Sequence, residues 1–251
     1  MVLWAAALLV GLLLGLVGGG GGIVTVPALV YGGGLDPKQA VATSLAVVGL
    51  IAAVAAVMEF RAGRVKWQDA LPFAVAGIIG TFFGAKVVSG LLSSSVQMLI
   101  FATIMVAAGL SMLRSALKEG RGQKGSVTTP TRRNAALLMV SGLGVGIVSG
   151  VVGIGGGFMI VPALVLFAGF DAKRAVPTSL AIIAVNSVGG VAGYFGKGLI
   201  VPDAFYLFSA VGMVGMVLGG QVRAKLPARV IKLVFAGLLL VMSVVVFFTR
   251  G

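Results

Sequence analysis

Six apolar segments of about 20 residues constrain the fold of this chain more than any other feature. They cover residues 40–60, 70–92, 96–114, 175–195, 202–222 and 231–249. A helix of about 20 apolar residues is long enough to cross the hydrocarbon core of a bilayer. Within lipid every backbone polar group must be bonded internally, which restricts spanning segments to helices and closed barrels. The sequence therefore predicts an all-α, polytopic bundle of transmembrane helices.

Composition excludes an ordinary water-soluble domain. Apolar residues make up 59% of the 251 residues and charged residues only 10%, against about 45–50% and about 25% in soluble domains. The chain has no Cys, no His and only six Asp and Glu residues, which excludes thiol and imidazole catalysis and leaves little material for a carboxylate metal site. We therefore expect no enzyme activity, no catalytic residue, no metal and no cofactor.

Two further apolar segments are interrupted by clusters of glycine. Residues 2–17 lead into Gly18–Gly22, and residues 135–152 lead into a second cluster at 153–157. Glycine costs about 1 kcal/mol relative to alanine inside a helix, so each cluster should break its helix. The apolar runs that follow are too short to span a membrane alone. Each interrupted segment is therefore predicted to form a re-entrant helical hairpin.

The half-helices after the two breaks are expected to begin near Ile23 and Phe158, with Pro27 and Pro162 reinforcing the interruption. A helix N-terminus presents unpaired N–H groups and the positive end of the helix dipole, which together favour anions. Glycine also lets a ligand approach the backbone closely. The breaks are thus predicted to form a paired anion cradle near the bilayer midplane. The alternative is close helix packing through small residues.

The chain repeats itself at an offset of 135 residues. About 20 of the 33 positions from 15 to 47 are identical to those 135 residues later. Such self-similarity is the signature of a duplicated structural unit, and it is common in transporter folds. The predicted domains are a first repeat at 1–117, a basic cytoplasmic linker at 118–134 and a second repeat at 135–251.

Loop charges predict how the two repeats are oriented, because Lys and Arg concentrate on the cytoplasmic side. If each hairpin returns to the side from which it entered, about 15 of the 19 basic residues lie inside, whereas a full crossing of the second hairpin would leave about 11 inside. Each repeat is then a re-entrant hairpin plus three spans. Three is an odd number of crossings, so the repeats are predicted to be inverted. Reporter fusions at residues 93 and 226 should accordingly report opposite sides.

The predicted substrate-binding residues combine the glycine clusters, the hydroxyl pairs that follow each hairpin, and one amide within an apolar span. They are Gly19, Gly20, Gly21, Gly22, Thr43, Ser44, Gly155, Gly156, Gly157, Thr178, Ser179 and Asn186. The hydroxyls can donate to an anion, although hydroxyl-to-backbone bonding and plain helix packing are the alternatives. Polar groups within apolar spans are often functional, which is why the amide is included.

Four charged residues near or within the spans carry separate expectations. Asp36 and Asp171 precede helices and are expected to cap their free N–H groups. Glu59 lies near the end of a span and is expected at the membrane interface. Lys86 lies inside a span, where it either reaches outward to water or draws an anion inward.

These motifs resemble the TauE/SafE family of membrane permeases. The pattern is Gly18–Gly22, then Val26–Leu29 and Ala42–Leu45, and it recurs at 153–157, 161–164 and 177–180. The resemblance implies export or uptake of a small sulfur-containing anion, such as sulfite or a sulfonate like sulfoacetate, across a prokaryotic inner membrane. Ile154 stands where the first cluster has Gly19, so the two breaks are not equivalent.

The sequence therefore predicts a secondary transporter of a small anion with alternating access. An anion-selective channel and a non-transporting membrane scaffold remain the alternatives. The expected partners are the anion, the lipid bilayer and a second copy of the chain in a homodimer. Nucleic acid is not expected, because the positive charges are accounted for by the cytoplasmic face.

Overall fold

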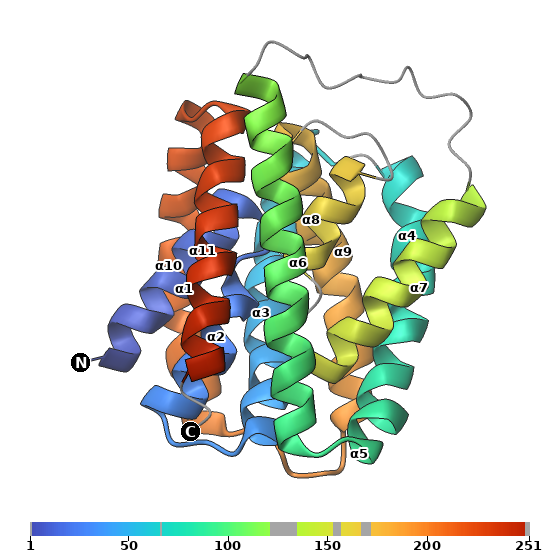
Figure 1. Ribbon diagram of the computed structural model, residues 1–251, viewed down its shortest axis with the longest axis vertical. Coiled ribbons are helices and arrows are strands. Elements are labelled where there is room, and N and C mark those ends of the chain that lie inside the picture. The colour runs from blue at the N-terminus through green and yellow to red at the C-terminus, as the bar shows by residue number, and fades with distance from the viewer. Residues whose placement is uncertain (1, 66, 121–134, 153–156, 167–171, 249–251) are drawn as a thin grey trace.

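The computed structural model describes residues 2–65, 67–120, 135–152, 157–166 and 172–248, which form a bundle of helices (Figure 1). The first half contains α1 (Val2–Val17), α2 (Gly21–Pro27), η1 (Ala28–Gly32), α3 (Pro37–Arg61), α4 (Trp67–Phe83), η2 (Gly84–Val88), α5 (Ser89–Leu91) and α6 (Ser94–Gly120). The second half contains α7 (Ala135–Val152), α8 (Gly157–Leu166), α9 (Ala172–Tyr194), α10 (Pro202–Lys225) and α11 (Ala228–Phe248). The segments η1 and η2 are π-helical turns that continue α2 and α4.

The six predicted spans are confirmed. Among the described residues, the helices long and apolar enough to cross a membrane are Pro37–Arg61, Ala70–Val88, Ser95–Leu117, Arg174–Tyr194, Pro202–Lys225 and Ala228–Phe248. Their ends are set by capping as well as by hydropathy. Asp36 caps α3 as predicted, since its Oδ1 accepts from the Lys38 N–H at 2.8 Å, while Gln39 Oε1 accepts from the Asp36 N–H at 3.4 Å. Asp171 lies outside the described residues.

The first break interrupts the chain where it was predicted, but the next helix begins earlier than expected. Gly18 has a φ of +74°, a conformation that glycine adopts without steric cost. α2 then starts at Gly21, and α8 starts at Gly157, not near Ile23 and Phe158.

The expectation that the two prolines reinforce the breaks is wrong. Pro27 lies within α2 and Pro162 lies within α8. The chain passes directly from Pro27 into the π-helical turn η1. Such local adjustments allow membrane helices to contain a proline, because they re-satisfy the backbone groups that the proline frees.

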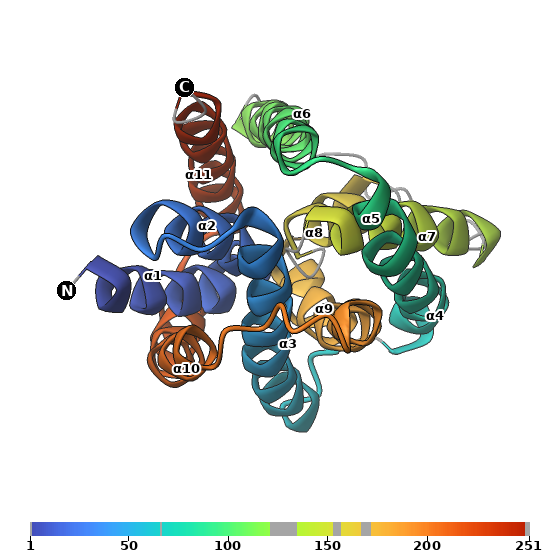
Figure 2. The same cartoon turned by 90° about the horizontal axis from the view of Figure 1, so that it is seen from below.

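Helices of one half pack reciprocally against helices of the other. α1 lies along α10 while α7 lies along α4, and α3 pairs with α9 while α6 pairs with α11. Seen along the bundle, α3 and α9 occupy the middle, α1 with α10 and α4 with α7 lie on opposite sides, and α6 with α11 lie at one edge (Figure 2).

The offset of 135 residues also relates individual contacts. A Cβ added to Gly80 of α4 would collide with the carbonyl oxygen of Leu143, and one added to Gly215 of α10 would collide with that of Leu8. Both members of the first pair become the second pair when shifted by 135. These are backbone-to-backbone approaches that only glycine permits. The duplication in sequence is therefore a duplication of helix-packing contacts.

Corresponding helices that touch each other run in opposite directions. On α3 and α9, Gly49 lies against Ser187, whereas Leu45 lies against Gly190. α6 and α11 are antiparallel as well (Figure 1). Inverted repeats would need this geometry, and the sidedness of the repeats in a membrane stays a prediction that the reporter fusions test.

Several basic residues gather at one end of the bundle. Arg64, after α3, and Arg223, near the end of α10, both pair with Glu59, which places the C-terminal ends of these helices together. Lys232 at the start of α11 lies 3.4 Å from Ser115 near the end of α6, at the same end. α6 continues to Gly120, so residues 118–120 of the predicted linker are helical, and residues 121–134 lie outside the described part.

Candidate functional site

The two glycine breaks meet in the interior of the bundle. A Cβ added to Gly157, the first residue of α8, would lie 2.7 Å from Cα and 3.1 Å from O of Gly19. Gly157 is buried, as are all four predicted glycines of the first break, Gly19, Gly20, Gly21 and Gly22. The starts of the half-helices α2 and α8 are thus brought together from the two halves. The predicted Gly155 and Gly156 lie outside the described residues.

Ser179 holds the first break from the opposite half of the chain. Its buried Oγ lies 2.9 Å from the carbonyl oxygen of Gly18 and 2.8 Å from that of Val176, so one hydroxyl proton is shared between two acceptors. A carbonyl at the end of a helix has no partner within that helix. Ser179 therefore lies at the predicted site, where it satisfies the backbone of the break.

Ser44 is the counterpart of Ser179 in the first half, and its environment differs. Its side chain is fully buried, and its Oγ has no hydrogen-bond partner in the described structure. A buried hydroxyl without a partner is costly and unusual in native proteins. Of the four predicted hydroxyls, that of Ser44 is the one left available to a ligand.

The two predicted threonines bond to the backbone instead of facing the breaks. Thr43 Oγ1 accepts from the Val201 N–H at 3.1 Å, just ahead of α10. Thr178 Oγ1 donates to the Arg174 carbonyl at 3.0 Å. The first contact satisfies an N–H at a helix start, where intrahelical partners are lacking. These two positions follow the hydroxyl-to-backbone alternative.

Asn186 lies one helical turn beyond the meeting point of the breaks. Ser179, Ile183 and Asn186 form a single stripe along α9, because residues spaced by three and four share a helix face. Ile183 Cδ1 lies 2.9 Å from the Cβ position of Gly157. The Asn186 side chain is buried against Gly77, and neither its Oδ1 nor its Nδ2 has a partner in the described part of the chain. The predicted amide is thus an unpaired polar group close to the breaks.

Two polar residues that the sequence analysis missed support the approach to the second break. Gln97 of α6 donates from Nε2 to the Val151 carbonyl, and Tyr194 of α9 donates from its hydroxyl to the Gly150 carbonyl at 3.2 Å. Both side chains are buried, and both acceptors lie in the last turn of α7. The signal for Gln97 was the one used for Asn186, a polar side chain within an apolar span.

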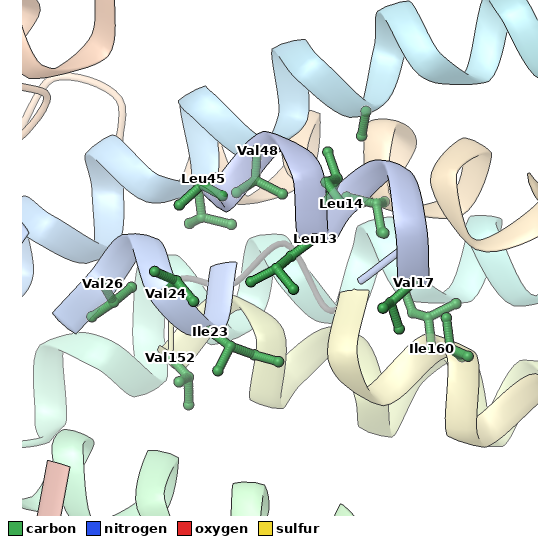
Figure 3. Close-up of a cluster of buried hydrophobic side chains, with 14 of the residues drawn as sticks. Leu13, Leu14, Val17, Ile23, Val24, Val26, Leu45, Val48, Val152 and Ile160 are labelled. Atoms are coloured by element: carbon green, nitrogen blue, oxygen red, sulfur yellow. The ribbon is translucent and has the colours of Figure 1, made fainter. Parts of the chain in front are cut away.

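Apolar side chains surround the first break. Figure 3 shows buried residues from α1, α2, α3, α7 and α8 packed about it. The labelled side chains are Leu13, Leu14, Val17, Ile23, Val24, Val26, Leu45, Val48, Val152 and Ile160. In such a low-dielectric setting, hydrogen bonds from backbone N–H groups and hydroxyls are electrostatically stronger than in water.

The structure also settles two expectations about charged residues. Glu59 does not lie exposed at an interface: it is 6% exposed, with Arg64 Nε 2.5 Å from its Oε2 and with Arg223 bonded to its Oε1. Lys86 is exposed, and its Nζ lies 5.3 Å from the centre of the Phe82 ring, so it follows the outward alternative.

Comparisons with known proteins extend over nearly the whole chain. The family model described as "Sulfite exporter TauE/SafE" matches residues 3–246. A "Probable membrane transporter protein" from Xylella fastidiosa is 34% identical over 183 residues, which cover 72% of this chain and 67% of the relative. The "Probable membrane transporter protein YdhB" of Bacillus subtilis is 26% identical over 225 residues, covering 90% and 89%. A Haemophilus influenzae protein described as "Probable membrane transporter protein" is 28% identical over 258 residues, covering 95% and 94%. No solved structure matches the chain.

Proposed function

This chain belongs to the sulfite exporter TauE/SafE family and is a multi-pass transporter of the cell membrane, and we propose that it carries a small oxyanion such as sulfite or a sulfonate across the bilayer. Membrane transporters are not enzymes, and no chemical conversion of the ion is proposed. The observation that supports the proposal most directly is the contact between Gly157 and Gly19, which joins the two helix breaks inside the bundle.

The chemistry of the breaks favours a small anion with several acceptor oxygens. α8 has ten residues, and α2 with η1 forms a continuous apolar helix over Gly21–Gly32. Each helix start carries unpaired N–H groups and a partial charge of about +0.5. An anion taken from water into apolar surroundings needs such compensation, because an uncompensated buried charge is very costly. The absence of side chains on Gly19 to Gly22 lets the ion reach these N–H groups.

Two side chains add to this cradle. The unpartnered Ser44 hydroxyl and the unpartnered Asn186 amide each provide hydrogen-bond donors from the helices that follow the hairpins. A bound oxyanion would give both groups the partner that the described structure lacks. We propose that these two residues contact the ion, while Ser179, Thr43 and Thr178 maintain the backbone around it.

Alternating access would follow from the reciprocal packing of the two halves. The same set of glycine contacts joins α1 to α10 and α7 to α4. Each re-entrant hairpin is therefore attached to a spanning helix of the opposite repeat. A rocking of one repeat against the other would move both hairpins about a central site, as in other transporters built from inverted repeats.

Uptake of labelled sulfite and sulfoacetate into liposomes containing the purified protein tests the proposal. We expect uptake to saturate with concentration and to be accelerated when unlabelled anion is present on the opposite side, since a carrier must bind the ion to reorient. Uptake that never saturates, together with single-channel currents, would favour an anion channel. Failure of either anion to bind or move would overturn the proposal.

A further inference from the structure

The two repeats differ where their hairpins approach the ends of the bundle. Under the offset of 135 residues, Glu59 corresponds to Tyr194 and Arg223 corresponds to Val88. Tyr194 is 3% exposed and bonds to the carbonyl of Gly150, so its ring fills the space beside α7. Gly150 corresponds to Gly15 of α1. The matching space beside Gly15 is occupied by charged side chains instead.

A pocket of about 200 Å³ occupies this space at the basic end. The lining residues that matter here are Gly15, Glu59, Arg64, Leu180, Gln221 and Arg223. The pocket reaches toward the first break, because Gly15 precedes Gly18 by three residues in the last turn of α1. Leu180 follows Ser179, whose hydroxyl bonds to the Gly18 carbonyl. The pocket thus lies between the charged cluster and the proposed anion cradle.

The charges in this pocket leave a surplus of positive charge. The single carboxylate of Glu59 is shared by Arg64, 2.5 Å away through Nε, and by Arg223 through Nη2. Two guanidinium groups and one carboxylate give a net charge of about +1, since Arg stays protonated in proteins. Arg223 is 8% exposed, and its Nη1 is buried without a hydrogen-bond partner in the described structure. A guanidinium in this condition has donors to offer to a second anion.

We propose that Arg223 forms an anion-binding station at the basic end of the molecule, from which a small oxyanion passes to the first glycine break. This inference rests on the proposed function for the identity of the ion. Glu59 holds the guanidinium in place through Nη2, and the ion binds on the Nη1 side. The side chain of Arg64 is 56% exposed, so it can contact both the entering ion and water. The station is one-sided, because Tyr194 occupies the equivalent place in the other repeat.

The absence of native cysteine allows a direct test by protection of a single thiol. Gln221→Cys places a thiol in the pocket wall, at an exposed residue two positions from Arg223. Ser93→Cys, an exposed position at the other end of the bundle, is the matched control. Both purified variants are labelled with an uncharged thiol reagent while sulfoacetate is titrated. We expect sulfoacetate to slow labelling of the Gln221→Cys thiol about tenfold and to leave the control unchanged.

The double variant Glu59→Gln/Arg223→Gln, made on the Gln221→Cys background, separates a site at Arg223 from a general attraction to the basic end. It removes one charge of each sign, so the net charge of the molecule is unchanged and no buried charge loses its partner. We expect protection by sulfoacetate to disappear in this variant. Arg64→Gln, at an exposed side chain, is the second variant and should weaken protection severalfold. Full protection in a folded double variant, unchanged protection with Arg64→Gln, or no protection in the parent would overturn the inference.

Transport measurements distinguish this inference from the proposed function. Saturable sulfite uptake without any protection at Gln221→Cys would retain the carrier and remove the station. Protection at Gln221→Cys without uptake of any anion would retain the station and remove the carrier.

Discussion

Glycines of the helix interfaces and glycines of the breaks do different work in this molecule. At the interfaces, a Cβ on Gly80 or Gly215 would collide with the backbone of a neighbouring helix. At the first break, a Cβ on Gly21 would meet the end of the Leu14 side chain at 3.1 Å, which can move aside. The first group is required by the separation of the helices. The second group leaves room at a helix start, where a ligand can approach the backbone.

Gly157 belongs to both groups, and this overlap is informative. It lies at a break, yet its Cβ position is 2.7 Å from the backbone of Gly19. The meeting of the two breaks therefore depends on the same backbone-to-backbone contact that joins the helices elsewhere. The alternative interpretation of the glycine clusters, close packing, describes part of the site and does not exclude the anion cradle.

The largest effect is expected from Gly80→Leu. The new side chain would have to displace the α7 backbone near Leu143, which should destabilise the fold by at least about 3 kcal/mol and prevent recovery of folded protein. Gly144→Leu on α7 is the control, because no atom lies within 4 Å of the Cβ position there. Thermal unfolding in detergent measures both variants. Equal stability of the two would show that the interface glycines are not needed for packing.

Gly157→Ala should come next, with its main effect on transport. The added methyl group would push α8 away from Gly19 and misplace the two helix starts, and we expect about a tenfold or greater loss of sulfite uptake. Gly237→Ala on α11 serves as the control, since its Cβ position is open. Folded Gly157→Ala protein with normal uptake would place the anion site away from the contact between the breaks.

The two serines should separate stability from binding. Ser179→Ala leaves the buried Gly18 carbonyl without its partner and should cost about 1–3 kcal/mol of folding free energy. Ser44→Ala removes a hydroxyl that has no partner, so we expect stability to stay within about 0.5 kcal/mol, while sulfite affinity falls about tenfold. Thermal unfolding with and without sulfite measures both terms. The reverse pattern would mean that the roles assigned to the two serines are exchanged.

Gly21→Ala should have the smallest effect of the series. The methyl group can be accommodated by movement of Leu14, and alanine is about 1 kcal/mol better than glycine inside a helix. We expect unchanged or slightly higher thermal stability and about a two- to threefold loss of anion affinity, measured by titration calorimetry. Severe destabilisation would place Gly21 among the interface glycines.

Much of the architecture could be predicted from local sequence, because each element depends mainly on its own residues. The six spans follow from apolar segments of sufficient length, and the capping of α3 follows from Asp36, Pro37 and Gln39. The position of the first break follows from Gly18, whose left-handed φ suits glycine. The start of α2 was placed too late, because glycine propensity alone does not show that Gly21 and Gly22 are held in a helix by buried packing.

Contacts between distant residues were harder to predict. Ser179 reaches Gly18 across 161 positions, and Arg223 reaches Glu59 across 164. The interpretation of Glu59 as an interfacial residue was wrong because hydropathy gives its depth along a helix but not the helix that covers it. Gln97 was missed for the same reason, since its partner is the end of a helix on the other half.

The amino-acid sequence alone thus specifies a membrane protein made of two related halves, each with a glycine break and three spans, since length, hydropathy and internal repetition are properties of the chain itself. The three-dimensional packing determines which glycines touch a backbone, which hydroxyl stays unpaired, and where a buried Arg faces a pocket. These features depend on which surfaces the helices present to one another. Two repeats with nearly the same motif can therefore end in a tyrosine-filled space on one side and a charged pocket on the other.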